Sequence, residues 1–280
     1  MKILFYSFLF FLFVNCYSQN SNEPRVLYEI LGMDNAQVKT DITYVVKGDS
    51  SLVMDIYYPA DFDFNSQIPA VLIVYGYSNE AQTRLMGKPF MKSKWYTSWC
   101  RLITTLNMAA IVYETTSPVA DLASLEQHLR SNASDLNIGS IGLFSVSANS
   151  AVAMDALLNP KNDQFKCGVF LYPYIITLDT EYKETIAELV SQYRSTMTQL
   201  PDKSTWDTNR PIYLVQAGKD EIKGIKETTG EFLKAAHSVN LPLTFVNYQQ
   251  GIHGFDAFQD SEGTKAILED VLDFLAKNLN

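Results

Sequence analysis

Short apolar segments alternate with segments of helical periodicity along most of this chain, and this alternation restricts the fold more than any other feature. Six of the apolar segments are rich in branched and aromatic residues and are bounded by turn residues: 70–75, 109–113, 140–144, 167–172, 212–217 and 243–248. Because each is apolar throughout, we expect strands that are buried on both faces. Repeated strand–helix units predict an α/β fold, with a parallel sheet covered by helices on both faces.

Two more strands are expected ahead of these, at 41–47 and 52–58, joined as an antiparallel hairpin by the Gly48-Asp49 turn. Helices are expected from Ser117-Pro118, after Ser147, and over 181–197, 226–237 and 261–279. No linker, repeat or low-complexity stretch divides the 280 residues, so one large domain is expected. The longest segment between strands, 179–209, is the candidate for a small cap.

The first 18 residues are expected to be a signal peptide rather than part of the fold. Lys2 precedes an apolar run from Ile3 to Val14, which is short for a membrane span. Cleavage before Gln19 would leave 19–280 as the mature domain, with no transmembrane span, whereas Cys16 offers an alternative lipid anchor. We favour plain cleavage, because Asn15 is a poor small-residue match before a lipidated cysteine. The chain is therefore expected to be exported, to the periplasm or the extracellular space.

Charge and metal-ligand content exclude several classes of function. Lys and Arg number 22 against 31 Asp and Glu, and a formal charge of -9 repels the phosphate backbone of nucleic acids. There is no HExxH, no CxxC and, with three histidines, no cluster at metal-ligand spacing, so no metal site is expected. Cys100 and Cys167 are too few for a disulfide framework and are expected to be buried thiols, although whether they pair stays open.

Ser147 is the strongest candidate for a nucleophile. Open α/β sheets place their chemistry at the carboxyl ends of the strands, and Ser147 lies between a buried strand and a helix start. This is the context of a nucleophile elbow, in which a sharp, strained turn exposes the serine hydroxyl. The usual pattern is G-x-S-x-G, but Ser145 and Asn149 stand at the two glycine positions. The alternative is that Ser147 merely caps the helix.

An acid and a histidine follow later strands in positions that suit a catalytic triad. Asp220 comes after the strand at 212–217, and His253 comes after the last strand. His253 would take the serine proton during attack on an acyl carbonyl, and Asp220 would fix the imidazole tautomer and stabilise the imidazolium. Glu221 is the alternative acid, less favoured because it lies one residue further into the loop.

The remaining requirement is an oxyanion hole, whose donors should be the Ala148 amide and one amide after the strand at 70–75. Tyr77 is the first choice, with Tyr75 and Gly76 as alternatives. Aromatic residues near strand ends or in the long loop after Tyr77 are candidates for a substrate pocket: Trp95, Tyr172 and Tyr174, together with Tyr75, Tyr77 and Trp99. Core packing is the alternative for about half of them.

From about Thr40 to its end, the chain resembles the α/β-hydrolases, in particular the dienelactone-hydrolase-like and serine esterase group. The motifs that carry the resemblance are Met54–Pro59, Ser117–Leu122, the Ser147 elbow, Ala217–Asp220 and His253–Phe255. The resemblance implies a three-layer fold around a mostly parallel eight-stranded sheet, no cofactor, and hydrolysis through an acyl-enzyme. Dienelactone hydrolases proper use cysteine as the nucleophile, so Ser147 favours ordinary esters.

Three classes of function follow from these observations. The leading one is an exported serine esterase that acts on small carboxylic esters. A peptidase shares the triad, but such hydrolases usually carry a large extra domain for which this chain has no spare residues. A non-catalytic binding protein with a hydrolase fold is the third class, because the elbow departs from the usual pattern.

Overall fold

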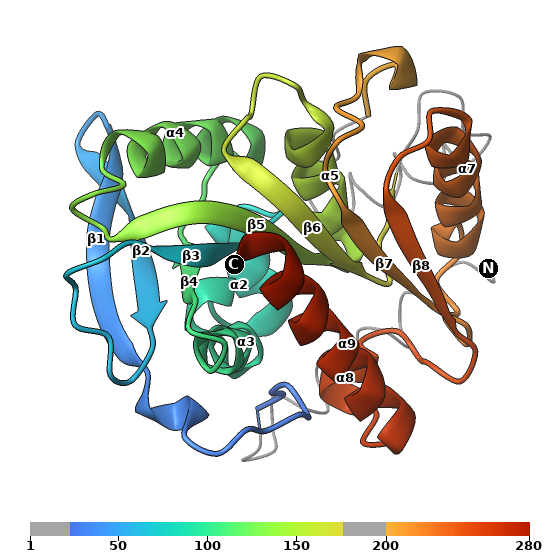
Figure 1. The fold of residues 1–280 in the computed structure, drawn as a ribbon, viewed down its shortest axis with the longest axis horizontal. Helices are drawn as coiled ribbons and strands as arrows, with labels where there is room; N and C mark the ends of the chain where they lie inside the picture. The colour runs from blue at the N-terminus through green and yellow to red at the C-terminus, as the bar shows by residue number, and fades with distance from the viewer. Residues whose placement is uncertain (1–22, 176–199) are drawn as a thin grey trace.

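A computed structural model describes residues 23–175 and 200–280. Its centre is an eight-stranded sheet with the order β1-β2-β4-β3-β5-β6-β7-β8 (Figure 1). The strands are β1 (Gln37–Lys47), β2 (Ser50–Tyr58), β3 (Ile68–Ile73), β4 (Ala109–Tyr113), β5 (Ile138–Val146), β6 (Phe165–Leu171), β7 (Ile212–Ala217) and β8 (Leu243–Tyr248). β2 pairs antiparallel with both β1 and β4, and all other neighbouring pairs are parallel. The expected mostly parallel sheet with an antiparallel hairpin at its start is confirmed.

Helices cover both faces of this sheet, as expected for a three-layer α/β/α fold. They are α2 (Asn79–Met86), α3 (Lys94–Thr104), α4 (Pro118–Ser131), α5 (Ser150–Leu158), α7 (Ile225–Ser238), α8 (Phe255–Phe258) and α9 (Glu262–Leu279). Figure 1 shows α4, α5 and α7 over one face, and α3 and α9 over the other. Short 3-10 turns, η1 to η4, lie at Met33–Asn35, Phe90–Lys92, Ser147–Asn149 and Lys203–Thr205.

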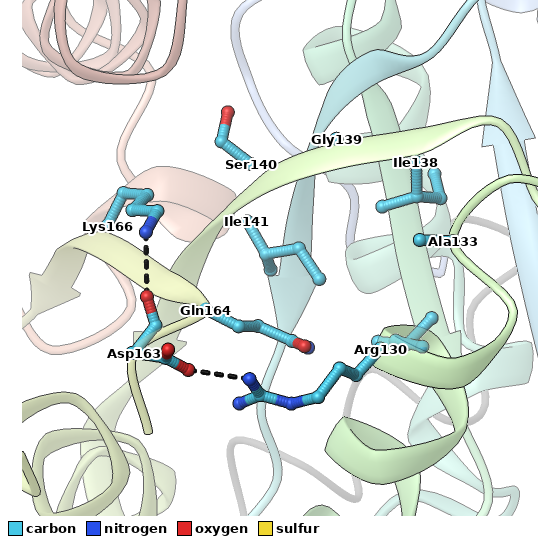
Figure 2. Close-up of a pocket in the computed structure, with 10 residues that line it drawn as sticks. Arg130, Ala133, Ile138, Gly139, Ser140, Ile141, Asp163, Gln164 and Lys166 are labelled. Carbon is cyan, nitrogen blue, oxygen red and sulfur yellow. Dashed lines mark hydrogen bonds and ion pairs between the residues drawn. The ribbon is translucent and has the colours of Figure 1, made fainter. Parts of the chain in front are cut away.

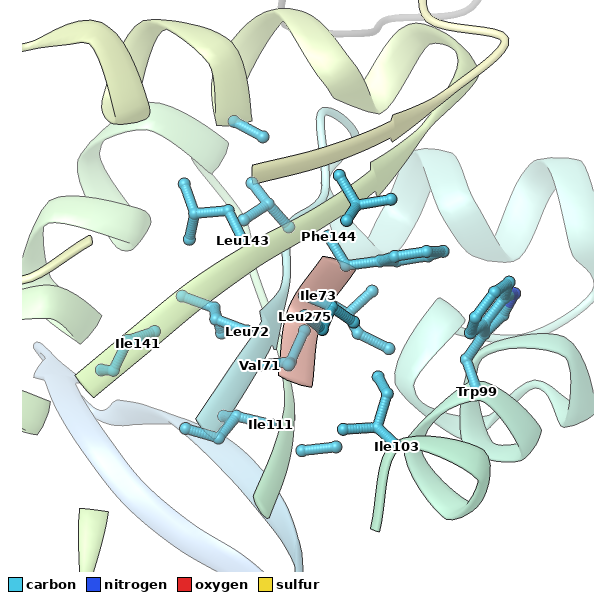
Figure 3. Packing of buried hydrophobic residues seen from close by; sticks show 14 of the residues in the cluster. Val71, Leu72, Ile73, Trp99, Ile103, Ile111, Ile141, Leu143, Phe144 and Leu275 are labelled. Carbon is cyan, nitrogen blue, oxygen red and sulfur yellow. The ribbon is translucent and has the colours of Figure 1, made fainter. Parts of the chain in front are cut away.

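The central strands β3 and β5 form the most deeply buried part of the core. Leu72 and Leu143 have no exposed surface, and Phe144 packs on Trp99 of α3 with ring centroids 4.4 Å apart (Figure 3). Leu275 of α9 is buried with them. Full burial of one such side chain contributes about 1.5–3 kcal/mol, so this core holds the strand ends in fixed positions. The site described below lies at those ends.

Two helices occupy a segment that the sequence left as a loop. α2 and α3 lie between Tyr77 and β4, where no helix was expected. α2 has only eight residues, most of them polar, and α3 is rich in aromatic and β-branched residues of modest helix propensity. Both therefore depend on packing against their surroundings rather than on a local signal.

Several expectations lie outside the described residues. These are the signal peptide at 1–18, the helix at 181–197 and most of the segment 179–209 proposed as a cap. Its described end, 200–209, contains η4. Within residues 23–175 and 200–280, no helix combines the length and the apolarity that crossing a bilayer requires.

Candidate active site

β5 ends in a strained turn that presents Ser147. The strand stops at Val146, and Ser147 has a φ of 53°, in the left-handed region that L-residues other than glycine rarely adopt. A 3-10 turn follows immediately, and α5 begins at Ser150. Ser147 is partly exposed, whereas its neighbours along β5 are buried. The local structure is therefore the strand–turn–helix arrangement expected of a nucleophile elbow.

The two residues that replace the usual glycines are both buried and hydrogen-bonded. Ser145 donates from Oγ to the Val74 carbonyl at 3.2 Å. Asn149 turns its side chain away from the turn, and its Oδ1 accepts from the Gly76 amide at 2.8 Å. The turn therefore accommodates both side chains without a clash.

The loops that carry Asp220 and His253 are joined to each other by their backbones. The Gly218 amide donates to the Tyr248 carbonyl at 2.7 Å, and the Lys219 amide donates to the Gly251 carbonyl at 2.8 Å. A Cβ on Gly218 would lie 2.5 Å from the backbone of Gln249, so only glycine allows this close approach. The contact places the ends of β7 and β8, and the side chains that follow them, in one region.

The structure brings the three sequence-predicted side chains into one hydrogen-bonded line. Ser147 Oγ lies 2.9 Å from His253 Nε2, and His253 Nδ1 lies 2.7 Å from Asp220 Oδ2. The Asp220 side chain is fully buried, its other oxygen accepts from the Ile222 amide at 3.0 Å, and the His253 side chain is 15% exposed. Glu221, the alternative acid, is exposed to solvent. This line has the geometry through which a serine proton can pass to an imidazole held by a carboxylate.

A buried carboxylate lies behind the histidine. The Tyr172 ring packs on the His253 ring at 4.7 Å between centroids, and the Tyr172 hydroxyl donates to Asp256 Oδ1 at 2.6 Å. The indole nitrogens of Trp95 and Trp99 each donate to Asp256 Oδ2 at 2.8 Å. Burial raises the pKa of the Asp256 carboxyl, although the three donated hydrogen bonds act in the opposite direction.

The expected oxyanion donors fall into two groups. The Gly76 amide is bonded to Asn149, and the Tyr75 amide donates to the Tyr113 hydroxyl at 3.3 Å. Ala148 lies directly after Ser147 in the 3-10 turn, and Tyr77 lies one residue beyond the Gly76 contact. Ala148 and Tyr77, the first choices from the sequence, are the two amides that we carry forward as proposed donors.

The aromatic candidates for a substrate pocket divide by exposure. Tyr75, Trp99, Tyr172 and Tyr174 are buried, and Trp95 and Tyr77 are partly exposed. The Tyr174 backbone amide donates a hydrogen bond to the Ser147 carbonyl at 3.0 Å, so Tyr174 stabilises the turn at Ser147. Of the six, only Trp95 and Tyr77 are more than marginally exposed in the described structure, and the role of all six in substrate binding stays a prediction.

Within the described residues the two cysteines are unpaired, and no metal site is formed. Cys100 and Cys167 are free and buried, and burial raises the pKa of both thiols, that of Cys167 to about 12. In the described part of the chain, no group of three or more His, Cys, Asp or Glu side chains is placed to hold a metal ion.

A cavity of about 330 Å³ lies away from the triad, at the amino ends of β5 and β6 (Figure 2). Arg130 forms ion pairs there with Asp163 at 2.7 Å and Glu126 at 3.0 Å. Lys166 donates to the Asp163 carbonyl. These groups already satisfy one another, so the cavity shows no side chain aimed at a ligand.

Three residues close to the triad and the loop after β3 were not expected from the sequence. Gln82 donates from Nε2 to the Tyr77 carbonyl, and the Tyr96 hydroxyl accepts from Asn149 Nδ2. Both lie in helices that were not expected, and no motif marks either of them. Asp256 lies three residues after His253, and an acidic residue in an apolar stretch was the signal that could have found it.

Comparison with known proteins gives neighbours among the solved structures. No protein-family model and no curated protein matches the chain. An esterase from the Planctomycetes species Thermogutta terrifontis, in its native form, superposes with a TM-score of 0.61 at 19% identity, covering 88% of this chain and 93% of that one. The apo form of esterase 2 from the same organism gives 0.62 at 18% identity, over 88% and 95% of the two chains. The chain therefore has an α/β-hydrolase fold, the fold of these esterases.

Proposed function

We propose that this protein is a serine esterase that hydrolyses small carboxylic esters through an acyl-enzyme on Ser147. The observation that carries the proposal is the hydrogen-bonded line from Ser147 through His253 to Asp220 at the carboxyl ends of β5, β7 and β8. Sites in open α/β sheets lie at this edge. The strained backbone of Ser147 supports the same role, because such strain gathers at functional residues.

Each side chain has a defined part in the reaction. His253 Nε2 accepts the proton of Ser147 Oγ while the oxygen attacks the ester carbonyl carbon. The Ala148 and Tyr77 amides donate to the oxygen that becomes negative, and Asp220 stabilises the imidazolium. His253 then returns the proton to the leaving alcohol, and water repeats the sequence on the acyl-enzyme.

The neighbouring structures support a small acyl group and an ordinary ester. The Thermogutta esterase has been solved with butyrate bound and with propionate bound, and after phosphoramylation by tabun. We infer that short-chain esters fit this chain as well. The dienelactone-hydrolase-like subtype rests on the sequence motifs, and a serine in place of cysteine favours simple esters over lactones.

Fluorophosphonate labelling together with Ser147→Ala tests the proposed function. Loss of a triad nucleophile lowers turnover by about a million-fold, whereas loss of a capping hydroxyl costs about 1 kcal/mol of stability. We expect wild-type protein to be labelled at Ser147 and to cleave p-nitrophenyl acetate and butyrate. The folded Ser147→Ala variant should do neither.

Two other outcomes would contradict the proposal. A folded wild-type protein that is neither labelled nor active would support a non-catalytic binding protein. Retained turnover in pure Ser147→Ala would remove Ser147 as the nucleophile, and Ser145 would be tested next. Acetylated sugars and a peptide substrate, assayed in parallel, separate the esterase classes from a peptidase.

We also propose that the chain is exported, as residues 1–18 predict, and that 19–280 is the mature domain. The support is the Lys2 charge and the apolar run that follows it. Mass spectrometry of protein secreted by a bacterial host should give a first residue of Gln19. A mass that places a lipid on Cys16 would instead establish an anchored form.

A further inference from the structure

Two buried amide side chains hold the loop after β3 against the turn at Ser147. Asn149 is 3% exposed, and its Oδ1 accepts a hydrogen bond from the Gly76 amide at 2.8 Å. Gln82 of α2 is fully buried, and its Nε2 donates to the Tyr77 carbonyl at 2.6 Å. The Gly76 N–H belongs to the peptide before the 76–77 peptide, and the Tyr77 carbonyl belongs to the peptide after it. Side chains therefore fix the backbone on both sides of the 76–77 peptide, which carries the Tyr77 amide.

The second polar group of each amide is also hydrogen-bonded. Because the Gly76 N–H can only donate, the Asn149 oxygen faces it, and Nδ2 then donates to the Tyr96 hydroxyl at 3.1 Å. Gln82 Oε1 accepts from the Phe90 amide at 2.7 Å. A buried amide with both ends bonded keeps a single orientation, so these two side chains act as rigid connections.

The loop backbone rests directly on the turn. A Cβ at Gly76 would lie 2.9 Å from the Ala148 carbonyl oxygen and 3.0 Å from the Asn149 Cα. The hydrogen bond from the Gly76 amide to Asn149 Oδ1 joins the same two segments. Since the proposed oxyanion donors are the amides of Ala148 and Tyr77, Asn149 joins the two halves of the oxyanion hole.

We propose that Asn149 is a positioning residue that sets the separation between the Ala148 and Tyr77 amides, with Gln82 holding the other side of the loop. The inference rests on the proposed function, because the separation of the two amides matters only when Ser147 attacks an ester and the carbonyl oxygen becomes an oxyanion. Donors stabilise that oxyanion only at hydrogen-bond distance, and a displacement of about 1 Å lowers rates by about 100-fold. Asn149 is then a functional replacement for the usual glycine.

Two substitutions at Asn149 test this role. Asn149→Ala removes the connection, and Asn149→Gly removes it while restoring the glycine of the usual elbow. We expect kcat per active site to fall by about 10- to 100-fold in both variants, with KM within about threefold of wild type. Active sites are counted by fluorophosphonate incorporation at Ser147 carried to completion, so a loss caused only by partial misfolding lowers the number of labelled sites and leaves kcat per site unchanged.

A second measurement examines the oxyanion itself. Ser147 Oγ adds to the carbonyl carbon of an alkyl trifluoromethyl ketone, its proton passes to His253, and the carbonyl π electrons become the oxyanion of a hemiketal. The inhibition constant of the ketone should rise by the factor by which kcat/KM falls. The constant for the corresponding alcohol, which forms no adduct, should stay unchanged.

A matched control comes from another asparagine that bonds to backbone. Asn162 donates from Nδ2 to the Ala156 carbonyl at 3.0 Å, and it lies in the turn before β6, at the opposite end of the sheet. Asn162→Ala should keep wild-type kcat per active site. Gln82→Leu breaks the hydrogen bond on the other side of the loop and should lower kcat as the Asn149 variants do. This variant replaces the Asn149 variants as the test if those do not fold.

The results distinguish this inference from the proposed function. An inactive, unlabelled wild type overturns both. Active wild type together with Asn149→Gly and Asn149→Ala at wild-type kcat per site overturns the positioning role alone. Equal losses for Asn149→Ala and Asn162→Ala would also overturn it, because the effect would then come from general destabilisation.

Discussion

Ser147 and Tyr172 both have left-handed backbones, at the ends of the neighbouring strands β5 and β6. Their φ angles are 53° and 38°, and each costs about 1–2 kcal/mol for a residue with a Cβ. The Tyr172 amide donates to Val215, and the Tyr174 amide donates to Ser147, so hydrogen bonds from both sides hold these conformations. At the candidate site this strain falls on the residue proposed to react and on the residue packed on its histidine, whereas the other positive φ angles of non-glycine residues, at Asp41, Phe64, Asn107, Asn137 and Asn240, lie elsewhere in the described chain.

Asp256 gives a prediction about the pH dependence of stability. Because burial raises its pKa in the folded state, the folded protein binds the proton more tightly than the unfolded chain does. The unfolding free energy contributed by this group therefore falls as pH rises from about 4, the unfolded pKa, through the folded one. The Asp256→Asn variant has no such titrating proton, so its unfolding free energy relative to wild type should increase as pH rises above about 4. Urea unfolding at several pH values measures the difference.

Asp121 provides a control of opposite sign. Burial raises the pKa of this carboxyl, but hydrogen bonds from Lys47 and from backbone amides outweigh burial and hold the pKa below its usual value. Its contribution is present above the unfolded pKa and is lost as pH falls through the folded one. The difference in unfolding free energy between Asp121→Asn and wild type should therefore change with pH only below about pH 4. A constant difference between Asp256→Asn and wild type from pH 4 to 7 would contradict the raised pKa.

Among the structural elements, the paired ends of β7 and β8 control the relation between Asp220 and His253. Gly218→Ala would place a Cβ 2.5 Å from the Gln249 backbone, which cannot move aside as a flexible side chain does. We expect a loss of about 1–3 kcal/mol in the unfolding free energy, as for other overpacked sites. Ester turnover should fall by at least about 10-fold, because the two loops must separate. Urea denaturation and steady-state kinetics measure the two effects.

Gly230 in α7 is the matched control for Gly218. A Cβ there has nothing within 4 Å, and the position lies inside a helix. Gly230→Ala should raise the unfolding free energy by about 0.5–1 kcal/mol and leave turnover unchanged. If Gly218→Ala behaved in the same way, the close approach of the two loops would not be what aligns Asp220 with His253.

The sequence predicts elements well where burial imposes a local pattern. β4, β7 and β8 have the bounds expected from their apolar runs, and β5 extends the expected range by two residues at each end. α2 and α3 were not predicted, since the first is short and polar and the second owes its buried face to tertiary packing. Local patterns do not record such packing.

The residues of the candidate site also differ in how well the sequence predicts them. Ser147, Asp220 and His253 were found because each follows a predicted strand, and parallel strands end at one edge of the sheet. Asn149 was recognised only as a departure from a pattern. Its bond to Gly76 joins residues 73 positions apart, and the sequence contains no sign of that pairing.

At the scale of the whole molecule, the buried thiols report on how cooperatively the described part of the chain unfolds. Cys100 on α3 and Cys167 on β6 have no exposed surface, and burial raises the pKa of both. We expect neither to react with a thiol reagent in the folded protein, because the thiolate is the reactive form. In rising denaturant both should be labelled at one shared rate, which peptide mapping can follow residue by residue. Faster labelling of one cysteine would show that its element opens separately.

The Ser147–His253–Asp220 line also has a consequence for the order in which the chain is made. Synthesis proceeds from the amino end, and the serine is 106 residues ahead of the histidine that must take its proton. A growing chain that stops before residue 253 carries a completed elbow but no base. Even after His253 has been added, β5 and β6 still lack α9, whose Leu279 carbonyl accepts from Ser140 and whose side chain lies against Gly142. Under the proposed mechanism, we therefore expect a chain that stops before residue 253 to be unable to hydrolyse esters, because it lacks the base that takes the serine proton.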